Sequence, residues 1–233
     1  MSIEGRKLLV TGGTGALGRA VVLAALDRGA EVAATYLVAE ECAAAETAFG
    51  GRAVLVQADL GSEDQTATAV DAAAAALGGL DGIVAIAGGF DMGPLAEVDG
   101  SRFDAMMSMN ARSLYHTLRA GVPHLKAAGG GSITAIGARP AVAGAAQMAA
   151  YAASKAAVMS LVQSLSQELL ASHIRVNAVL PSIIDTPANR AAMPDADHAA
   201  WVTPEALAKI ILFLTSSEAA PISGALVPAY GRA

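Results

Sequence analysis

The sequence predicts a single α/β domain in which a doubly wound parallel sheet carries helices on both faces. Short, almost continuously apolar runs alternate with longer segments of helical pattern, as buried parallel strands and their crossover helices do. The chain has 233 residues, enough for one large core. Apolar residues make up 54% of it and charged residues only 15%, which suits a large buried sheet.

The expected elements follow one another along the chain. The apolar runs expected to be strands are 7–11, 30–36, 52–57, 80–87, 131–137, 173–180 and 225–230. The segments expected to be helices are 16–28, 39–48, 63–77, 102–126, 149–171 and 203–216. Two helix starts carry capping signals: Ser62 with Gln65 three residues later, and Thr203 followed by Pro204. This order implies βαβ units.

Composition argues against several classes of function. The net charge of −6 disfavours nucleic-acid binding, which needs a basic face. No uncharged run of strong hydrophobes is long enough to span a membrane. The four histidines are scattered without metal-ligand spacing, and Cys42 is the only cysteine. We therefore expect a cytoplasmic protein with no metal site and no internal disulfide, acting on a small molecule.

Residues 8–21 read as a strand, a glycine turn and the start of a helix. Gly13, Gly15 and Gly18 match the pattern G-x-G-x-x-G in that context. Without Cβ atoms the turn can approach a pyrophosphate, and the helix N-terminus supplies N–H groups and the positive end of its dipole. We expect a dinucleotide site here rather than a tight turn alone.

The end of the second strand bears on the choice between NAD and NADP. A carboxylate about 20 residues after the glycine turn would bind the ribose 2′-hydroxyl of NAD. Tyr36 and Leu37 occupy that place, while Glu40 and Glu41 come later, on the next helix. Absence of the acid removes a repulsion against NADP, and absence of an arginine removes its usual clamp. NAD(H) and NADP(H) both stay open, and the sequence favours NADP(H), with the Thr35 and Tyr36 hydroxyls as hydrogen-bond donors.

Tyr151 and Lys155 are four residues apart in an alanine-rich segment, so they share one helix face. An ammonium beside a phenol favours the phenolate, so we expect the pKa of Tyr151 to fall below its usual value of about 10. Such a group can donate or accept a proton near neutral pH. Beside a dinucleotide turn, the pair indicates carbonyl reduction. Without that turn, a packed tyrosine and a lysine reaching water would be the simpler interpretation.

Together these motifs resemble the short-chain dehydrogenase/reductase family over almost the whole chain. Residues 11–18 resemble its cofactor turn, 85–88 its sheet motif, 109–113 its asparagine helix and 175–187 its nicotinamide-side loop. The resemblance implies a single Rossmann domain over 1–233, with a sheet of about seven strands, and a homotetramer or homodimer. It implies these cofactor contacts: Gly12, Thr14, Gly15, Leu17, Gly18, Tyr36, Asp59, Leu60, Ala87, Gly88, Tyr151, Lys155, Pro181, Ile184 and Thr186.

The resemblance also implies catalytic roles. Tyr151 is the proton donor. Lys155 lowers the pKa of Tyr151 and binds the nicotinamide ribose, and Asn110 holds a water that links Lys155 to solvent. The family's catalytic serine, however, lies 13 residues before the tyrosine, and that position here is Ala138. Loss of one such hydrogen-bond donor costs about 10²–10³ in rate.

The alanine leaves three interpretations open. The substrate is electrophilic enough to need no serine; another group, such as Thr134 or Gln147, replaces the hydroxyl; or the chain is a non-catalytic dinucleotide-binding sensor. The first has support from one branch of the family, quinonoid dihydropteridine reductase, whose Val-Ala-Gly-Gly-Trp motif resembles residues 86–90. The chain differs from that branch in keeping Asn110 and in lacking an acid at Tyr36.

The substrate side adds one indication. Only 17 residues separate Thr186 from Pro204, so the lid around 187–203 is short and the pocket should be open. Trp201 is either a stacking face for a flat ligand or an anchor of the lid. The sequence thus predicts an NAD(P)H-dependent reductase of a conjugated carbonyl or imine, with a quinonoid dihydropterin as the sharpest candidate. The alternative enzyme is a generic ketone or 3-oxoacyl reductase of the same family.

Overall fold

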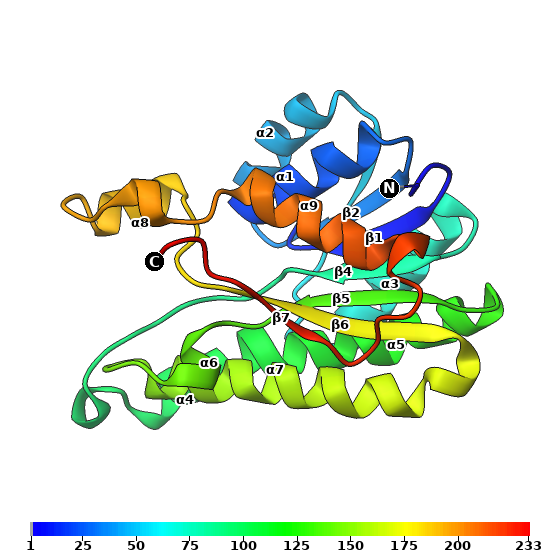
Figure 1. The fold of residues 1–233 in the computed structure, drawn as a ribbon. Coiled ribbons are helices and arrows are strands. Elements are labelled where there is room, and N and C mark those ends of the chain that lie inside the picture. The colour runs from blue at the N-terminus through cyan, green and yellow to red at the C-terminus, as the bar shows by residue number, and fades with distance from the viewer. Residues whose placement is uncertain (1) are drawn as a thin grey trace.

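The computed structural model describes residues 2–233, and these form one seven-stranded parallel sheet with helices on both faces (Figure 1). The strands lie in the order β3-β2-β1-β4-β5-β6-β7. Their bounds are Lys7–Thr11 (β1), Glu31–Tyr36 (β2), Ala53–Gln57 (β3), Gly82–Ala85 (β4), Gly131–Ile136 (β5), Ile174–Pro181 (β6) and Leu226–Ala229 (β7). This confirms the predicted single-domain Rossmann fold and the predicted order of strands along the chain.

The helices cover the sheet in two layers (Figure 1). Their bounds are Ala16–Leu26 (α1), Ala39–Phe49 (α2), Glu63–Leu77 (α3), Gly100–Met106 (α4), Ser113–Ala127 (α5), Pro140–Ala143 (α6), Ala149–Glu168 (α7), Pro187–Ala192 (α8) and Pro204–Thr215 (α9). Short 3₁₀ turns lie at Leu95–Glu97, Leu170–Ser172, His198–Ala200 and Ser217–Ala219. Helices α1, α2 and α9 lie on one face of the sheet, and α3, α5 and α7 lie on the other.

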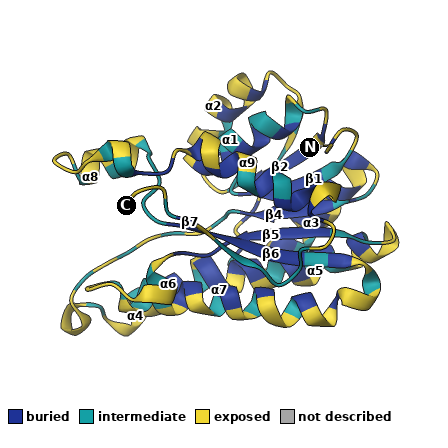
Figure 2. Ribbon diagram, viewed as in Figure 1, coloured by how far each residue is buried: buried dark blue, intermediate teal, exposed yellow. Residues whose placement is uncertain are grey.

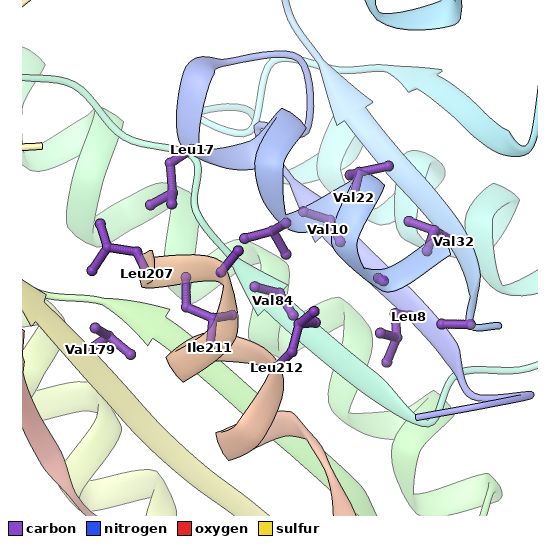
Figure 3. Packing of buried hydrophobic residues seen from close by; sticks show 14 of the residues in the cluster. Leu8, Val10, Leu17, Val22, Val32, Val84, Val179, Leu207, Ile211 and Leu212 are labelled. Atoms are coloured by element: carbon purple, nitrogen blue, oxygen red, sulfur yellow. The ribbon is translucent and has the colours of Figure 1, made fainter. Parts of the chain in front are cut away.

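Alternate residues of the strands pack into two hydrophobic cores, one on each face of the sheet. Leu8 and Val10 of β1 pack with Val22 of α1 and Leu212 of α9 (Figure 3). Leu9, between them in the sequence, packs on the opposite face against α3, α5 and α7. Figure 2 shows the result: the inner strands of the sheet are buried, whereas the edge strands β3 and β7 are partly exposed. The near-continuous apolar character of the strands follows from this double burial.

The two capping signals are largely confirmed. Thr203 Oγ1 accepts a hydrogen bond from Ala206 N at 3.2 Å at the start of α9. Ser62 Oγ accepts one from Gln65 N at 3.4 Å at the start of α3. The Gln65 side chain, however, accepts from Asp59 N at 3.1 Å, so it binds the loop that follows β3 instead of the N-cap residue.

Three predicted elements differ from the structure in instructive ways. The helix predicted over 102–126 begins at Gly100 and is interrupted by a π-helical turn over Met107–Arg112. The strand predicted over 80–87 ends at Ala85, because the next two backbone N–H groups donate to Thr11 Oγ1 at 3.1 and 3.2 Å. The helix predicted over 149–171 ends at Glu168 and continues as a 3₁₀ turn.

The segment predicted to be a lid, 187–203, contains α8 and stands away from the body of the sheet (Figures 1 and 2). A single parallel bridge between Ile184 and Val202 closes its base. Within residues 2–233, no helix is long and apolar enough to cross a lipid bilayer.

Candidate active site

A cavity of about 360 Å³ lies at the carboxyl ends of the central strands. The strand order reverses at β1, which pairs with β2 on one side and β4 on the other, and this is where open α/β sheets bind ligands. Ten of the predicted cofactor residues line this one cavity: Gly12, Thr14, Gly15, Leu17, Gly18, Tyr36, Asp59, Leu60, Ala87 and Gly88.

The glycine turn is built for close backbone approach. Gly12 has a φ of +65°, and a Cβ there would lie 2.9 Å from Ala87 Cα. A Cβ on Gly18 would lie 2.0 Å from Gly12 O, so α1 packs directly on the turn. Gly15 is the N-cap of α1 and offers no side-chain cap, which leaves the first N–H groups of this 11-residue helix for a ligand. Turn, helix end and cavity together fit a dinucleotide pyrophosphate.

The far end of the cavity is formed by β2, β3 and α2. Tyr36 ends β2, and Glu41 on the first turn of α2 also lines the cavity. Glu41 Oε2 accepts a hydrogen bond from Thr14 Oγ1 at 2.8 Å. Asp59 Oδ1 accepts one from Gly61 N at 2.8 Å, which fixes the loop after β3. The sequence placed Glu41 on this helix but gave no sign that its side chain turns back to the glycine turn.

Asn110 joins three segments at the other end of the cavity. It lies in the π-helical turn, and its Nδ2 donates to Gly89 O and to Ser154 Oγ, both at 3.0 Å. Its Oδ1 accepts from Gly89 N at 3.1 Å. The loop after β4, the π-turn and helix α7 are therefore held together by one buried amide. A π-turn of this kind often marks a functional position in a helix.

Lys155 and Tyr151 lie on α7, the helix to which Asn110 is hydrogen-bonded through Ser154. A Cβ on Gly88 would lie 2.5 Å from Asn110 Oδ1 and 3.3 Å from Lys155 Nζ, so both side chains meet at this cavity-lining glycine. Lys155 Nζ donates to Ile136 O at 2.9 Å. The edge of the Phe90 ring meets the ring of Tyr151, with centroids 4.9 Å apart.

Burial shifts the pKa values of both Lys155 and Tyr151, and the shift of Tyr151 is opposite to the one predicted. It lowers the pKa of Lys155 to about 8, because the ammonium is desolvated. It raises the pKa of Tyr151 to about 12, so the predicted fall was wrong for this structure. Desolvation of the phenolate is the cause of this rise, and Lys155 Nζ donates to the Ile136 carbonyl. At neutral pH Tyr151 is a phenol that can donate a proton.

The remaining predicted cofactor residues lie at the end of β6, outside the cavity lining. Pro181 ends that strand, and its carbonyl accepts from Arg139 N at 3.0 Å. Ile184 forms the bridge at the base of the lid. Thr186 caps α8 by accepting from Asn189 N at 3.2 Å. Their contacts with a cofactor stay a prediction.

The predicted substrate residues do not gather at one place. Ala138 follows β5 and is buried, with only 4% of its surface exposed. Gln147, at a φ of +63°, lines a separate cavity of about 130 Å³. Trp201 is 7% exposed and its ring centroid lies 4.4 Å from that of His198, which favours the lid-anchor interpretation. Thr134, the other group considered as a replacement hydroxyl, is buried against Thr215 Oγ1 at 3.3 Å.

Phe90 is a site residue whose role the sequence did not reveal. Its ring is 55% exposed although it contacts Tyr151, so it presents an open aromatic surface beside the phenol. The motif at residues 86–90 includes this aromatic residue, but the sequence does not show its contact with Tyr151, which joins a loop to a distant helix.

Comparison with known proteins gives consistent matches over nearly the full chain. The family model described as short chain dehydrogenase matches residues 6–197. The cis-4-hydroxycyclohexanecarboxylate dehydrogenase of Sinomonas cyclohexanicum is 33% identical over 237 residues, covering 97% of this chain and 95% of that protein. A short-chain type dehydrogenase/reductase from Mycobacterium ulcerans superimposes with a TM-score of 0.94 at 28% identity, covering 99% of this chain and 90% of that one. Carveol dehydrogenase from Mycobacterium avium, solved in complex with NAD, gives a TM-score of 0.90 at 27% identity and covers 99% and 98%.

Proposed function

The chain belongs to the short-chain dehydrogenase family, and from that premise we propose that it is a reductase in which Tyr151 protonates the oxygen of a carbonyl or the nitrogen of an imine. NAD(P)-dependent oxidoreduction is the activity that its matches support. A bound nicotinamide supplies the hydride that adds to the adjacent carbon. The direction of reaction, the substrate class and the residue roles are our proposal.

One observation carries the proposal: Asn110 and Lys155 meet at Gly88, which lines the dinucleotide cavity, and Tyr151 lies on the same helix as Lys155. A proton donor must lie within reach of the reacting atom and be protonated at the working pH. With a pKa raised to about 12 by burial, Tyr151 holds its proton throughout the physiological range. At neutral pH Tyr151 is therefore in the protonated form that reduction requires.

Lys155 and Asn110 have hydrogen-bonding capacity left for the cofactor and for a water. The Lys155 ammonium, with a pKa lowered to about 8, is still mostly charged at neutral pH and offers two donors beyond the one bound to Ile136 O. We assign these donors to the nicotinamide ribose. Asn110 donates both amide protons, to Gly89 O and to Ser154 Oγ. Its Oδ1 accepts from Gly89 N and has a second lone pair that can accept from a water.

Ala138 shapes the choice of substrate. A methyl group stands where a hydroxyl would bind the substrate oxygen. Thr134 Oγ1 is buried against Thr215 Oγ1, and Gln147 lines a separate cavity. Hydride delivery is then fastest to an acceptor that is already electron-poor, such as a conjugated carbonyl or imine. The exposed ring of Phe90 beside Tyr151 suits a flat, conjugated ligand. A quinonoid dihydropterin is the sharpest member of that class, although the relatives lend it no support.

A generic ketone reductase is the second candidate, and the relatives' names favour it. The Sinomonas relative is named for a ring alcohol, and another relative, from Rhizobium meliloti, is named as a probable galactose dehydrogenase. A non-catalytic dinucleotide sensor is the third, because Ala138 weakens catalysis. The Tyr151–Lys155–Asn110 arrangement argues against the third. The homodimer or homotetramer and the cytoplasmic location remain predictions.

A substrate panel separates these candidates. NADH and NADPH consumption should be followed with a saturated cyclic ketone, a conjugated enone, a quinone and a quinonoid dihydropterin. The proposal predicts turnover of the conjugated acceptors and slow turnover of the saturated ketone. Fast reduction of the saturated ketone would favour the generic ketone reductase. Dinucleotide binding without consumption against any acceptor would favour the sensor.

A further inference from the structure

The cavity wall at the end distant from Tyr151 carries a carboxylate that is held in place by the glycine turn. Glu41 lies on the first turn of α2, yet its Oε2 accepts the hydroxyl proton of Thr14 at 2.8 Å. Thr14 is buried in the turn between β1 and α1, so this contact ties α2 to the pyrophosphate end of the site. A carboxylate has about four acceptor positions, so most of this one stays free for a ligand.

The two hydroxyl groups that could serve a 2′-phosphate lie against other parts of the protein. Thr35 Oγ1 is buried and accepts from Gly12 N at 3.1 Å. The pKa of the Tyr36 hydroxyl is raised, chiefly by the neighbouring Cys42 thiol. Both hydroxyls lie at the end of β2, where the sequence suggested them as donors to NADP. The structure uses Thr35 to fix the glycine turn and places Tyr36 beside a thiol of α2 rather than beside a cation.

The charges on this wall are of one sign. Among the described residues that line the cavity, the charged ones are Glu41 and Asp59, and both are acids. Arg19, on α1, donates from Nη2 to Thr14 O at 3.2 Å and does not line the cavity. A 2′-phosphate needs a nearby cation, whereas a ribose 2′-hydroxyl needs a carboxylate that accepts its proton.

We propose that Glu41 is a specificity-determining residue that selects NAD(H) over NADP(H), by accepting the ribose 2′-hydroxyl and repelling a 2′-phosphate. This rests on the proposed dinucleotide site. It replaces the preference for NADP(H) suggested by the neutral strand end at Tyr36. The usual acid would stand at that strand end; here α2 supplies one five residues later, and the Thr14 contact brings it back to the cavity.

Direct binding measurements test this without relying on turnover. Dissociation constants for NADH and NADPH should be measured by fluorescence titration at one fixed ionic strength for the wild type, Glu41→Gln and Glu40→Gln. The amide oxygen of Glu41→Gln can still accept from Thr14, so the turn is kept while the charge is removed. Glu40→Gln removes the same charge from an exposed neighbour that does not line the cavity.

We expect the wild type to bind NADH at least tenfold more tightly than NADPH, which is about 1.4 kcal/mol. Glu41→Gln should reduce that ratio about tenfold, mostly through tighter NADPH binding, and Glu40→Gln should change it less than twofold. Equal or tighter NADPH binding by the wild type, or equal shifts in the two variants, would overturn this inference and leave the proposed function standing. If neither dinucleotide bound, both would fall.

Discussion

Lys155→Met should abolish a pH dependence of stability that the buried ammonium creates. Lys155 is 6% exposed, and burial lowers its pKa from 10.5 to about 8. In the unfolded chain the pKa returns to its usual value, so across this window the unfolded chain binds more protons than the folded one. The free energy of unfolding therefore rises with pH. Linkage gives a gain of about 2 kcal/mol between about pH 7.5 and about pH 10.

Urea unfolding followed by circular dichroism at both pH values measures this gain. Methionine has a similar length to lysine, so it fills the same space without a charge, and the variant should lack the rise that the wild type shows. Lys126→Met, at an exposed position on α5, is the matched control and should keep the wild-type response. Tyr151 is present in all three proteins, so its own contribution to the pH dependence is shared by wild type, variant and control. If the free energy of unfolding rose equally with pH in wild type and Lys155→Met, the inference that the Lys155 ammonium is desolvated would be refuted.

Two further substitutions test the substrate and cofactor ends of the site. Ala138→Ser should raise kcat/KM for a saturated ketone by up to about 10², since one well-placed donor to the substrate oxygen carries that much rate, and should change a conjugated acceptor little. No gain on the ketone would show that another group already fills this role. Gly18→Ala should lower the free energy of unfolding by about 1–3 kcal/mol, because its Cβ would lie 2.0 Å from Gly12 O. Gly15→Ala, whose Cβ would lie 3.6 Å from the same oxygen, should change it little, and equal losses in urea unfolding would contradict the close packing of α1 on the turn.

The fold could be predicted from the sequence because its signals are local. The strands are continuously apolar since both of their faces are buried, and Thr203 and Ser62 mark helix starts through contacts three residues away. The misplaced boundaries depend on distant partners. The strand β4 ends early because Thr11, on a neighbouring strand, takes the next two N–H groups. The π-turn holds Asn110, whose amide bonds Gly89 and Ser154, and periodicity alone cannot reveal these bonds.

The site was predictable where spacing alone positions a residue. The glycines of the turn and the Tyr151–Lys155 spacing fall into this class, and so does the alanine at position 138. The sign of the Tyr151 pKa shift was not predictable, because it depends on how deeply the fold buries the phenol. Glu41 was missed as a cavity residue for a similar reason: a glutamate on an exposed helix gives no indication that its side chain meets a threonine 27 residues earlier.

Tyr151→Phe tests the central claim most directly, because it removes one oxygen atom and leaves the Phe90 contact and the cavity wall in place. Turnover of the best acceptor from the substrate panel and the dissociation constant of the preferred dinucleotide should be measured on the same preparation. We expect turnover to fall by about 10²-fold or more, the scale of a positioned proton donor, while the dissociation constant changes less than about threefold. Near-wild-type turnover would contradict the account, because the proton would then come from water and Tyr151 would only pack against Phe90.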